Sequence, residues 1–318
     1  MKKFIKPMLA TLTNNYFSSS DWIYEEKFDG VRALAVKKSG KVSLMSRNEH
    51  LMNAQYPEIV QALEKDPADD FIIDGEIVAL DKNGITDFQM LQARINLKIE
   101  SRVKGEEKKI PIFYRVFDVL YAHDHDQRDL PLLERKEILK KLLTFNKTII
   151  YTTHRSPDGK IYFQQACKKG WEGIIAKKKE STYVSTRSPA WLKFKCAMNQ
   201  ELVIVGYTEP KGSRTDFGAL LVGYYADGKL IYAGKVGTGF SQETLHILGK
   251  KLRSREIKKC PLVQYAGPTK GVRWVKPELV GEFKFAQWTQ ASKLRVGRYQ
   301  GLRTDKDARD VVKEVAKK

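Results

Sequence analysis

Lys27 is the residue of this sequence whose surroundings best suit a nucleophile. It ends an apolar run, Trp22-Ile-Tyr-Glu-Glu, and comes just before Asp29-Gly30, a pair typical of a turn. A lysine at the end of a strand is held rigidly, and its amine can attack an electrophile once it is uncharged. Because Lys-x-Asp-Gly is a short pattern that arises by chance, its interpretation depends on the rest of the chain.

Four further motifs follow Lys27 in order. They are Asp74-Gly75-Glu76, Phe117-Asp118, Glu172-Gly173-Ile-Ile-Ala-Lys177 and Trp191-Leu-Lys193-Phe-Lys195. An uncharged lysine amine can attack the α-phosphate of a nucleotide and form a phosphoramidate. Together the motifs therefore predict a pocket that transfers a nucleotide.

Lys193 and Lys195 are one residue apart on a predicted strand, so we expect both to face the same side. Their charge would favour the uncharged amine of Lys27 and hold phosphate oxygens. The alternative for this pair is a solvated strand face. An aromatic at Phe117 could stack on a purine, although its apolar neighbours equally suit a phenylalanine of the core.

Glu76 and Glu172 are the candidate ligands for Mg²⁺ (or Mn²⁺), which binds through carboxylate oxygens and retained waters. Each lies beside a glycine, which lets backbone approach a ligand closely. The alternative is that each is an ordinary turn glutamate. We expect Asp29 and Asp74 to satisfy the hydrogen bonds of local turns.

Several cations suit the backbone phosphates of a nucleic acid, because guanidinium groups bind phosphate through a planar fork. Arg32 follows the Asp29-Gly30 turn, Arg47 ends the first predicted hairpin, and Arg187 precedes the Lys193/Lys195 strand. Arg214, in Lys-Gly-Ser-Arg, and Lys235 lie in glycine-containing segments. The alternative for any of them is a surface ion pair.

Composition bounds the class of protein. Lysine and arginine number 57 against 38 acidic residues, a net charge of +19 over 318 residues, which favours a polyanionic partner. A lysine-rich bias with solvated side chains is the alternative. Apolar content of 42% suits ordinary cores, and no apolar run is long enough for a membrane. We expect the basic start not to be a signal peptide, because its apolar stretch is interrupted too soon. Cys167, Cys196 and Cys260 are widely spaced, and we expect free thiols in a reducing compartment.

The first part of the chain alternates predicted strands and helices. A hairpin is expected around Ser39-Gly40, and the charged segment 100–109 reads as a loop. Further strands are predicted at 71–80 and 112–120, and helices at 56–64, 88–95, 131–143 and 157–169.

After Lys195 the pattern becomes rich in β-strands. Strands are expected at 201–208, 219–225, 229–236 and 278–288, with a turn at Asp227-Gly228 and a helix capped by Ser241. This suits a small Greek-key barrel of the OB type. The sequence predicts an α+β chain: a first domain of antiparallel sheets and helices at 1–197, then an OB-fold β-barrel at 198–318.

The ordered motifs resemble the covalent nucleotidyltransferases, the superfamily of ATP-dependent DNA ligases and mRNA capping enzymes. The likeness is greatest to the ligase module of bacterial DNA ligase D and its stand-alone relatives, and runs from Pro7 to about Lys306. It implies that the first domain is an adenylation (nucleotidyltransferase) domain, that Lys27 receives AMP, that Phe117 stacks on adenine and that Glu25 lies beside it. It also implies that Arg47 binds the nick. The segment Gly301-Leu-Arg303-Thr-Asp-Lys306 matches the last motif of the family.

The expected site residues follow from the motifs and the resemblance together. The catalytic residue is Lys27, and the metal ligands are Glu76 and Glu172. ATP is expected to contact Glu25, Lys27, Arg32, Glu76, Phe117, Lys177, Lys193, Lys195, Arg303 and Lys306. DNA is expected to contact Arg32, Arg47, Arg187, Arg214 and Lys235.

The resemblance implies a DNA ligase that uses ATP and Mg²⁺ (or Mn²⁺) to seal nicked or broken duplex DNA. We further expect a monomer, no membrane partner, a possible end-binding repair partner, and a cytoplasmic location, at the nucleoid if the source is bacterial. An RNA ligase or an RNA-capping guanylyltransferase would use the same lysine chemistry. A non-catalytic nucleic-acid-binding module with a vestigial pocket is the alternative from another class.

Overall fold

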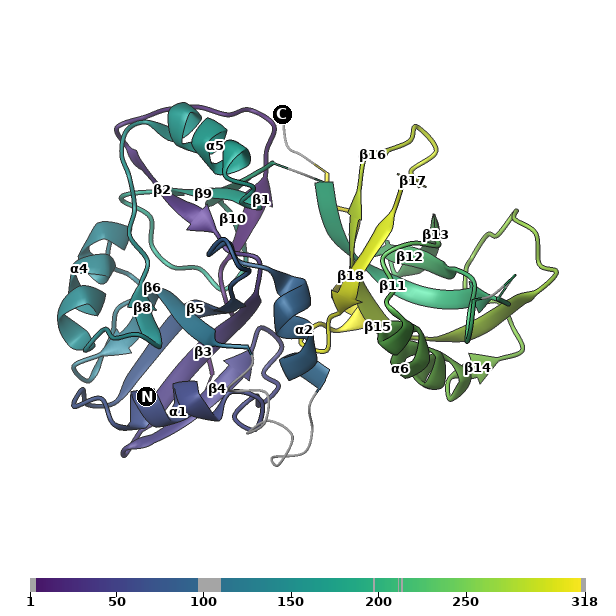
Figure 1. Ribbon diagram of the computed structural model, residues 1–318. Coiled ribbons are helices and arrows are strands. Elements are labelled where there is room, and N and C mark those ends of the chain that lie inside the picture. Colours follow the sequence, from purple (N-terminus) through teal and green to yellow (C-terminus); the bar gives the residue numbers. More distant parts are fainter. Residues whose placement is uncertain (1–3, 97–109, 197, 211, 213, 316–318) are drawn as a thin grey trace. The chain divides into compact units, whose positions relative to one another are not determined.

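The computed structural model describes residues 4–96, 110–196, 198–210, 212 and 214–315. For residues 93–96 it describes the backbone alone. The predicted loop at 100–109 lies outside these ranges. The chain forms two compact units, the first ending at Cys196 and the second at Glu314 (Figure 1). The domain limits of 1–197 and 198–318 remain a prediction. None of the helices in the described ranges is long and apolar enough to cross a membrane.

Two sheets form the first unit. The smaller has the order β1(Leu9–Leu12), β10(Arg187–Lys195), β9(Gly173–Lys178), β2(Trp22–Lys27), with β1 parallel to β10. The larger has the order β4(Lys41–Ser46), β3(Val31–Lys38), β5(Phe71–Ala79), β6(Ile112–Ala122), β7(His125–Asp126), and β8(Ile149–Tyr151) lies parallel beside β6. The β3–β4 hairpin and the long strands at β5 and β6 confirm the predicted ones.

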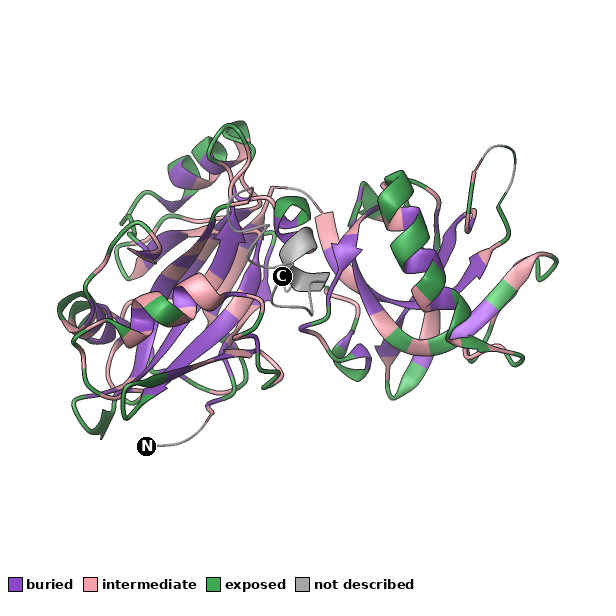
Figure 2. Ribbon diagram, turned by 60° about the horizontal axis from the view of Figure 1, so that its bottom comes forward, coloured by how far each residue is buried: buried purple, intermediate pink, exposed green. Residues whose placement is uncertain are grey.

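Helices cover the outer faces of these sheets, and one of them, which carries Leu132 and Lys136, also contacts residues of the inner faces. They are α1(Pro57–Glu64), α2(Phe88–Asn96), α4(Leu132–Leu142) and α5(Gly159–Lys168). Tyr162 and Ala166 of α5 pack on Tyr24, Ile174 and Phe194 of the smaller sheet. Figure 2 shows the buried residues concentrated on the strands.

The other faces of the two sheets meet each other. Ile23 and Trp191 of the smaller sheet share an apolar cluster with Leu34, Ile72 and Phe117 of the larger one. Side chains alternate between the two faces along a strand. Residues two or four positions away from these therefore also face the space between the sheets. We call these the inner faces.

Polar residues occupy inner-face positions that alternation would otherwise give to apolar side chains. On the smaller sheet they are Glu25, Lys27, Lys177, Lys193 and Lys195, and on the larger sheet Arg32, Asp74 and Glu76. A charged residue within a sheet interior is costly unless it is paired. The inner faces are therefore the place to look for a site.

Phe117 reaches the inner face through an irregularity of β6. The register between β5 and β6 passes from Asp74↔Asp118 to Gly75↔Val116, so Phe117 is the extra residue of a β-bulge. A bulge re-aims side chains next to it. Val116 consequently packs in the outer cluster and Phe117 in the inner one.

The second unit is a curled antiparallel sheet. Its order is β13(Lys229–Val236), β12(Leu220–Ala226), β11(Met198–Thr208), β15(Val272–Phe285), β14(Glu256–Ile257), with β18(Arg298–Leu302) paired to β15. Smaller elements are β16(Gln287–Trp288), β17(Leu294–Arg295) and the 3₁₀ turn η1(Ala308–Asp310). These strands and the helix α6 match the expected OB-type architecture, and the α+β fold class is confirmed.

The helix α6(Gln242–Arg253) begins as predicted, because the Ser241 side chain accepts a hydrogen bond from the Thr244 N–H. Leu245, Leu248 and Leu252 bury one stripe of it against the barrel. The Asp227-Gly228 turn also forms, with both residues in the left-handed region.

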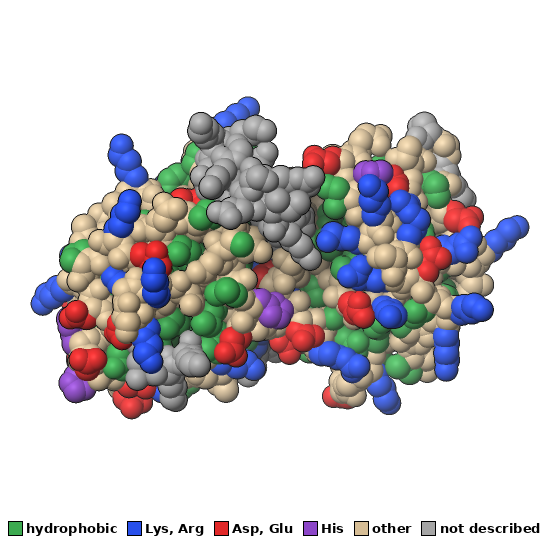
Figure 3. Space-filling view, turned by 90° about the horizontal axis from the view of Figure 1, so that it is seen from below, with side chains coloured by type: hydrophobic (Ala, Val, Ile, Leu, Met, Phe, Trp, Pro, Cys, Tyr) green, Lys and Arg blue, Asp and Glu red, His purple; other side chains and the backbone are tan. Residues whose placement is uncertain are grey.

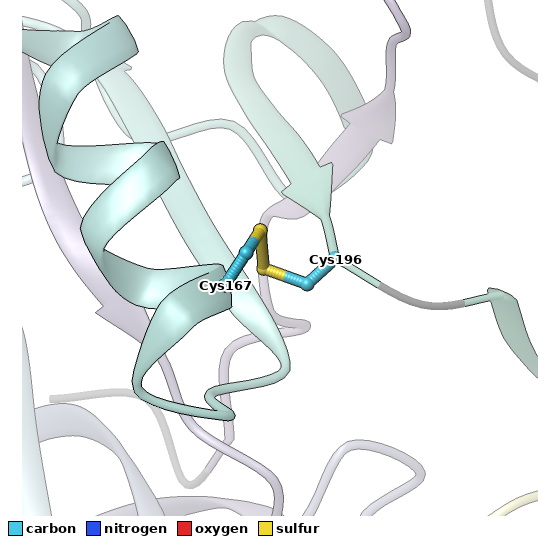
Figure 4. Close-up of a disulfide and its surroundings, with 2 residues drawn as sticks. All are labelled: Cys167 and Cys196. Atoms are coloured by element: carbon cyan, nitrogen blue, oxygen red, sulfur yellow. A yellow bond between two sulfur atoms is a disulfide. The ribbon is translucent and has the colours of Figure 1, made fainter.

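The expectation of three free thiols is wrong. Cys167, in the last turn of α5, is joined by a disulfide to Cys196, which follows β10 directly (Figure 4). Their Cα atoms are 5.2 Å apart although their sequence separation is 29. The packing of α5 on the outer face of the smaller sheet brings the two together, and spacing alone could not show it. Cys260 is the free thiol among the described cysteines.

Candidate active site

Lys27 lies at the end of β2, opposite Gly173 of β9. Its Nζ donates to Glu172 Oε2, and Lys195 Nζ lies 3.9 Å from the other oxygen of that carboxylate. All three side chains are less than one-fifth exposed. Three residues from separate motifs thus meet at one point, although Lys27 and Glu172 are 145 positions apart in sequence.

Gly173 makes this meeting possible. Its φ is +154°, and a Cβ there would lie 1.9 Å from the carbonyl oxygen of Phe194. The backbone of β9 therefore approaches β10 more closely than any side chain allows. The Cys196 N–H, which donates to the Glu172 carbonyl at 2.9 Å, closes the same corner.

A second cluster surrounds Glu25, which is only 1% exposed. One carboxylate oxygen accepts from Lys136 Nζ, and the other lies 2.6 Å from Lys177 Nζ. Burial alone would raise the pKa of Glu25, but the two ammonium groups outweigh it and the pKa is lowered. Burial lowers the pKa of Lys177 to about 8.

Arg32 and Asp74 form a bidentate ion pair between β3 and β5. Arg32 Nε and Nη2 donate to the two Asp74 oxygens, both at 2.5 Å, and the Tyr183 hydroxyl donates to Asp74 at 2.6 Å. The expectation that Asp74 serves a local turn is wrong, because it lies in mid-strand. Its partner is a cation on the neighbouring strand.

Phe117 is buried, with 7% exposed, and packs edge-on against Trp191 at 6.2 Å between ring centroids. Lys177 Nζ is 4.3 Å from the Phe117 centroid and 4.0 Å from that of Trp191, and the Arg32 guanidinium is 4.7 Å from Phe117. Phe117 is thus a core residue that also borders two charged groups. Stacking on a purine remains a prediction.

Glu76 lies half-buried on β5, in register with Arg32 of β3 and Arg115 of β6. Lys193 is half-buried on the inner face of β10, in register with Ile175. In the part of the chain that the structure describes, no group of three or more Asp, Glu, His or Cys residues could hold a metal by itself. Glu76 and Glu172 are therefore candidates as single carboxylate ligands.

Arg303 and Lys306 belong to the second unit. Arg303 donates to both Asp305 oxygens at 2.8–2.9 Å and lies 3.4 Å from Glu282, and Lys306 Nζ lies 3.0 Å from Glu201. These cations are held by carboxylates of their own unit. Their contact with ATP remains a prediction.

The expected DNA contacts have varied surroundings. Arg214 donates to the Gly218 and Gly237 carbonyls, and Arg187 to that of Ala10, so both guanidinium groups also bind backbone. Arg47 is half-buried after β4, and Lys235 is exposed on β13. Figure 3 shows Lys and Arg side chains spread over one face of the second unit, with some acidic side chains among them.

The sequence reasoning missed Lys136, Trp191 and Tyr183. A signal for Lys136 exists, since it lies four residues after Leu132 and three before Leu139 on the buried stripe of α4. A lysine in such a stripe needs a buried partner. Trp191 opens the motif that contains Lys193 and Lys195 but has no role predicted from it, and nothing in the sequence marks Tyr183.

Comparisons with known proteins agree with this geometry. The family model "ATP dependent DNA ligase domain" matches residues 7–195, and "ATP dependent DNA ligase C terminal region" matches residues 213–306. The multifunctional non-homologous end joining protein LigD of Pseudomonas aeruginosa is 39% identical over 321 residues, covering 99% of this chain and 37% of that protein. The corresponding DNA repair protein of Mycobacterium tuberculosis is 35% identical over 317 residues, covering 98% and 40%.

This chain therefore spans about two fifths of the length of these curated relatives. Among solved structures, a mycobacterial DNA ligase D complexed with ATP and MES is similar with a TM-score of 0.67, 30% identity and 98% coverage of both chains. The first family model alone covers more than half of this chain. The chain belongs to the ATP-dependent DNA ligase family.

Proposed function

We propose that this chain is an ATP-dependent DNA ligase that works through an adenylate carried on Lys27. The observation that carries the proposal is the Lys27–Glu172–Lys195 cluster, in which the expected nucleophile, a carboxylate and a cation converge on the inner face of one sheet. Membership of the family supports ATP as the nucleotide.

In the first step the uncharged Lys27 amine attacks the α-phosphorus of ATP. An Nζ–P bond forms, the bond from that phosphorus to the bridging oxygen breaks, and pyrophosphate leaves with the electron pair. The amine must give up a proton for this attack. We propose that Glu172, which is in contact with Nζ, accepts it, and that Lys195 and Lys193 hold phosphate oxygens.

Sealing then takes two further transfers. The 5′-phosphate of a DNA break displaces Lys27 from the adenylate, and the 3′-hydroxyl next attacks that phosphate and releases AMP. The +19 charge favours a polyanionic partner, and Arg32, Arg47, Arg187, Arg214 and Lys235 are the proposed DNA contacts.

A divalent cation fits this site only with help from the substrate. Since the described residues offer single carboxylates at Glu76 and Glu172 and no complete ligand set, phosphate oxygens and waters would have to complete the coordination. We propose Mg²⁺ or Mn²⁺ in this role. When bound, it would neutralise charge on the phosphates.

We also propose that the protein acts as a monomer in the cytoplasm on nicked or broken duplex DNA. An end-binding repair protein is a proposed partner, because the similar LigD proteins are named for non-homologous end joining. In a reducing compartment the Cys167–Cys196 bond would be exposed to thiol reductants.

The first test is transfer of label from ATP carrying ³²P in the α-phosphate. We expect acid-stable label on the wild-type protein and none on Lys27→Ala. Lys178→Ala is the matched control, because Lys178 is an exposed lysine at the end of β9. Label that persists on Lys27→Ala would show that another residue is the nucleophile.

A second comparison tests the substrate. We expect sealing of nicked duplex DNA with ATP, and little with NAD or GTP. Preferential joining of RNA ends would favour an RNA ligase, and a nucleotide adduct formed from GTP rather than ATP would favour a capping enzyme.

A further inference from the structure

Lys136 is a buried lysine that no sequence motif explains. It lies on α4 with 1% of its surface exposed. Its Nζ donates to Glu25, to the Thr152 carbonyl at 3.1 Å and to the Phe117 carbonyl at 3.5 Å, and lies 4.9 Å from the Tyr151 ring centroid. An ammonium group has three protons, and each has an acceptor here. Lys136 is therefore fixed in position.

Lys177, the other cation at Glu25, is held differently. Its ammonium contacts one Glu25 oxygen and two aromatic rings, Phe117 and Trp191. Burial lowers the pKa of Lys177 to about 8, whereas the Glu25 carboxylate outweighs burial at Lys136 and raises the pKa there. Lys136 has three acceptors and Lys177 contacts one carboxylate oxygen, so Lys136 is the more firmly held partner of Glu25 and Lys177 is the one that a ligand can displace.

Glu25 and the Phe117 ring lie near each other, since the Lys177 ammonium is 2.6 Å from a Glu25 oxygen and 4.3 Å from the ring centroid. Nearby, the Thr152 hydroxyl is buried and has no hydrogen-bond partner among the described residues. A buried polar atom of this kind suits a polar ligand. A purine stacked on Phe117 would place one polar edge here.

We propose that Lys136 is a positioning residue for nucleotide selection, which holds Glu25 as a hydrogen-bond acceptor and so favours a purine with an amine at C6. The inference rests on the proposed function, with Glu25 and Phe117 as the base-binding residues. An ionised carboxylate can only accept hydrogen bonds. The 6-amine of adenine donates one, whereas the 6-carbonyl of hypoxanthine or guanine places a second acceptor against it.

The test compares ATP with ITP, which carries hypoxanthine and has a carbonyl at C6. Formation of the covalent adduct is followed with each nucleotide, labelled in the α-phosphate, to give a single-turnover rate constant and a half-saturating concentration. The variants are Lys136→Met, Lys136→Arg and, as the matched control, Lys140→Met, which removes an exposed lysine from the same helix.

We expect the wild-type protein to prefer ATP, and Lys136→Met to reduce that preference by about tenfold or more, mainly through the half-saturating concentration of ATP. Lys136→Arg keeps the cation and should restore most of the preference. Lys140→Met should behave as wild type. A merely structural role would lower the use of ATP and ITP equally, and that result would overturn the inference.

If thermal melting shows that Lys136→Met does not fold, Glu25→Gln tests the same contact, because its amide can also donate. The ATP preference should then fall, and an unchanged preference would overturn the inference. Failure of the wild-type protein to form any adduct would instead contradict the proposed function.

Discussion

At the scale of single residues, most of the buried charged side chains of the first unit are paired with a side chain of opposite charge. Arg32 is matched by Asp74, and Arg135 by Asp118, with both side chains of the latter pair fully buried. The group of Glu25, Lys136 and Lys177 is different, because two cations share one carboxylate. One excess positive charge in a dry interior is costly. It is relieved if Lys177 loses its proton or if an anionic ligand arrives.

This excess charge predicts a pH dependence of stability. The pKa of Lys177 is about 8 in the folded chain, against an ordinary value of 10.5. Between these values the unfolded chain binds more protons, so the free energy of unfolding rises with pH, by at most about 1.4 kcal/mol per pH unit from this group. Urea unfolding of wild type and Lys177→Met from pH 8 to 10 measures it. The wild-type protein should gain stability relative to the variant as pH rises, and a constant difference would contradict the pKa.

Secondary-structure elements place these residues, and the sequence predicted the elements better than their details. Strands and helices with clear periodicity, such as β5 and α4, lie where expected. The bulge that turns Phe117 inward was not predictable, because it depends on register between β5 and β6. Lys27, Glu172 and Lys195 could be named from their motifs. Lys136, the partner of Glu25, and Tyr183, the partner of Asp74, come from elements that only folding brings close.

The disulfide is the clearest case of this limit, and it predicts a loss of stability on reduction. Cys167 and Cys196 close a loop with a sequence separation of 29 residues. For a loop of this length, the lower entropy of the cross-linked unfolded chain stabilises the folded state by about 3.5 kcal/mol. We expect a reductant to lower the free energy of unfolding by about this amount, measured by urea denaturation. Cys167→Ser with Cys196→Ser should show the lower stability under both conditions.

The control is Cys260→Ser, which removes the free thiol and should leave the response to reductant unchanged. A wild-type protein equally stable with and without reductant would mean that the bond contributes nothing to folding.

For the whole molecule, the motifs are divided between the two units. Lys27 and its neighbours belong to the first, and the last motif, with Arg303 and Lys306, to the second. Arg303 is only 8% exposed and is held by Asp305 and Glu282. A cation matched by acids in its own unit has to exchange partners before it can bind a phosphate. We infer that Arg303 serves one step of the reaction, the one in which pyrophosphate leaves.

Arg303→Ala should therefore slow self-adenylation far more than sealing of a nick that already carries AMP. Loss of one group that stabilises charge in a transition state costs about 100-fold or more in rate. Only self-adenylation releases pyrophosphate, so it should carry that loss. Since the variant leaves Asp305 and Glu282 without their cation, sealing of the pre-adenylated nick also reports that the protein is folded. Lys229→Ala, at an exposed turn, is the matched control. Equal losses of rate in the two assays would show that Arg303 supports the fold of the second unit and has no specific role in the first chemical step.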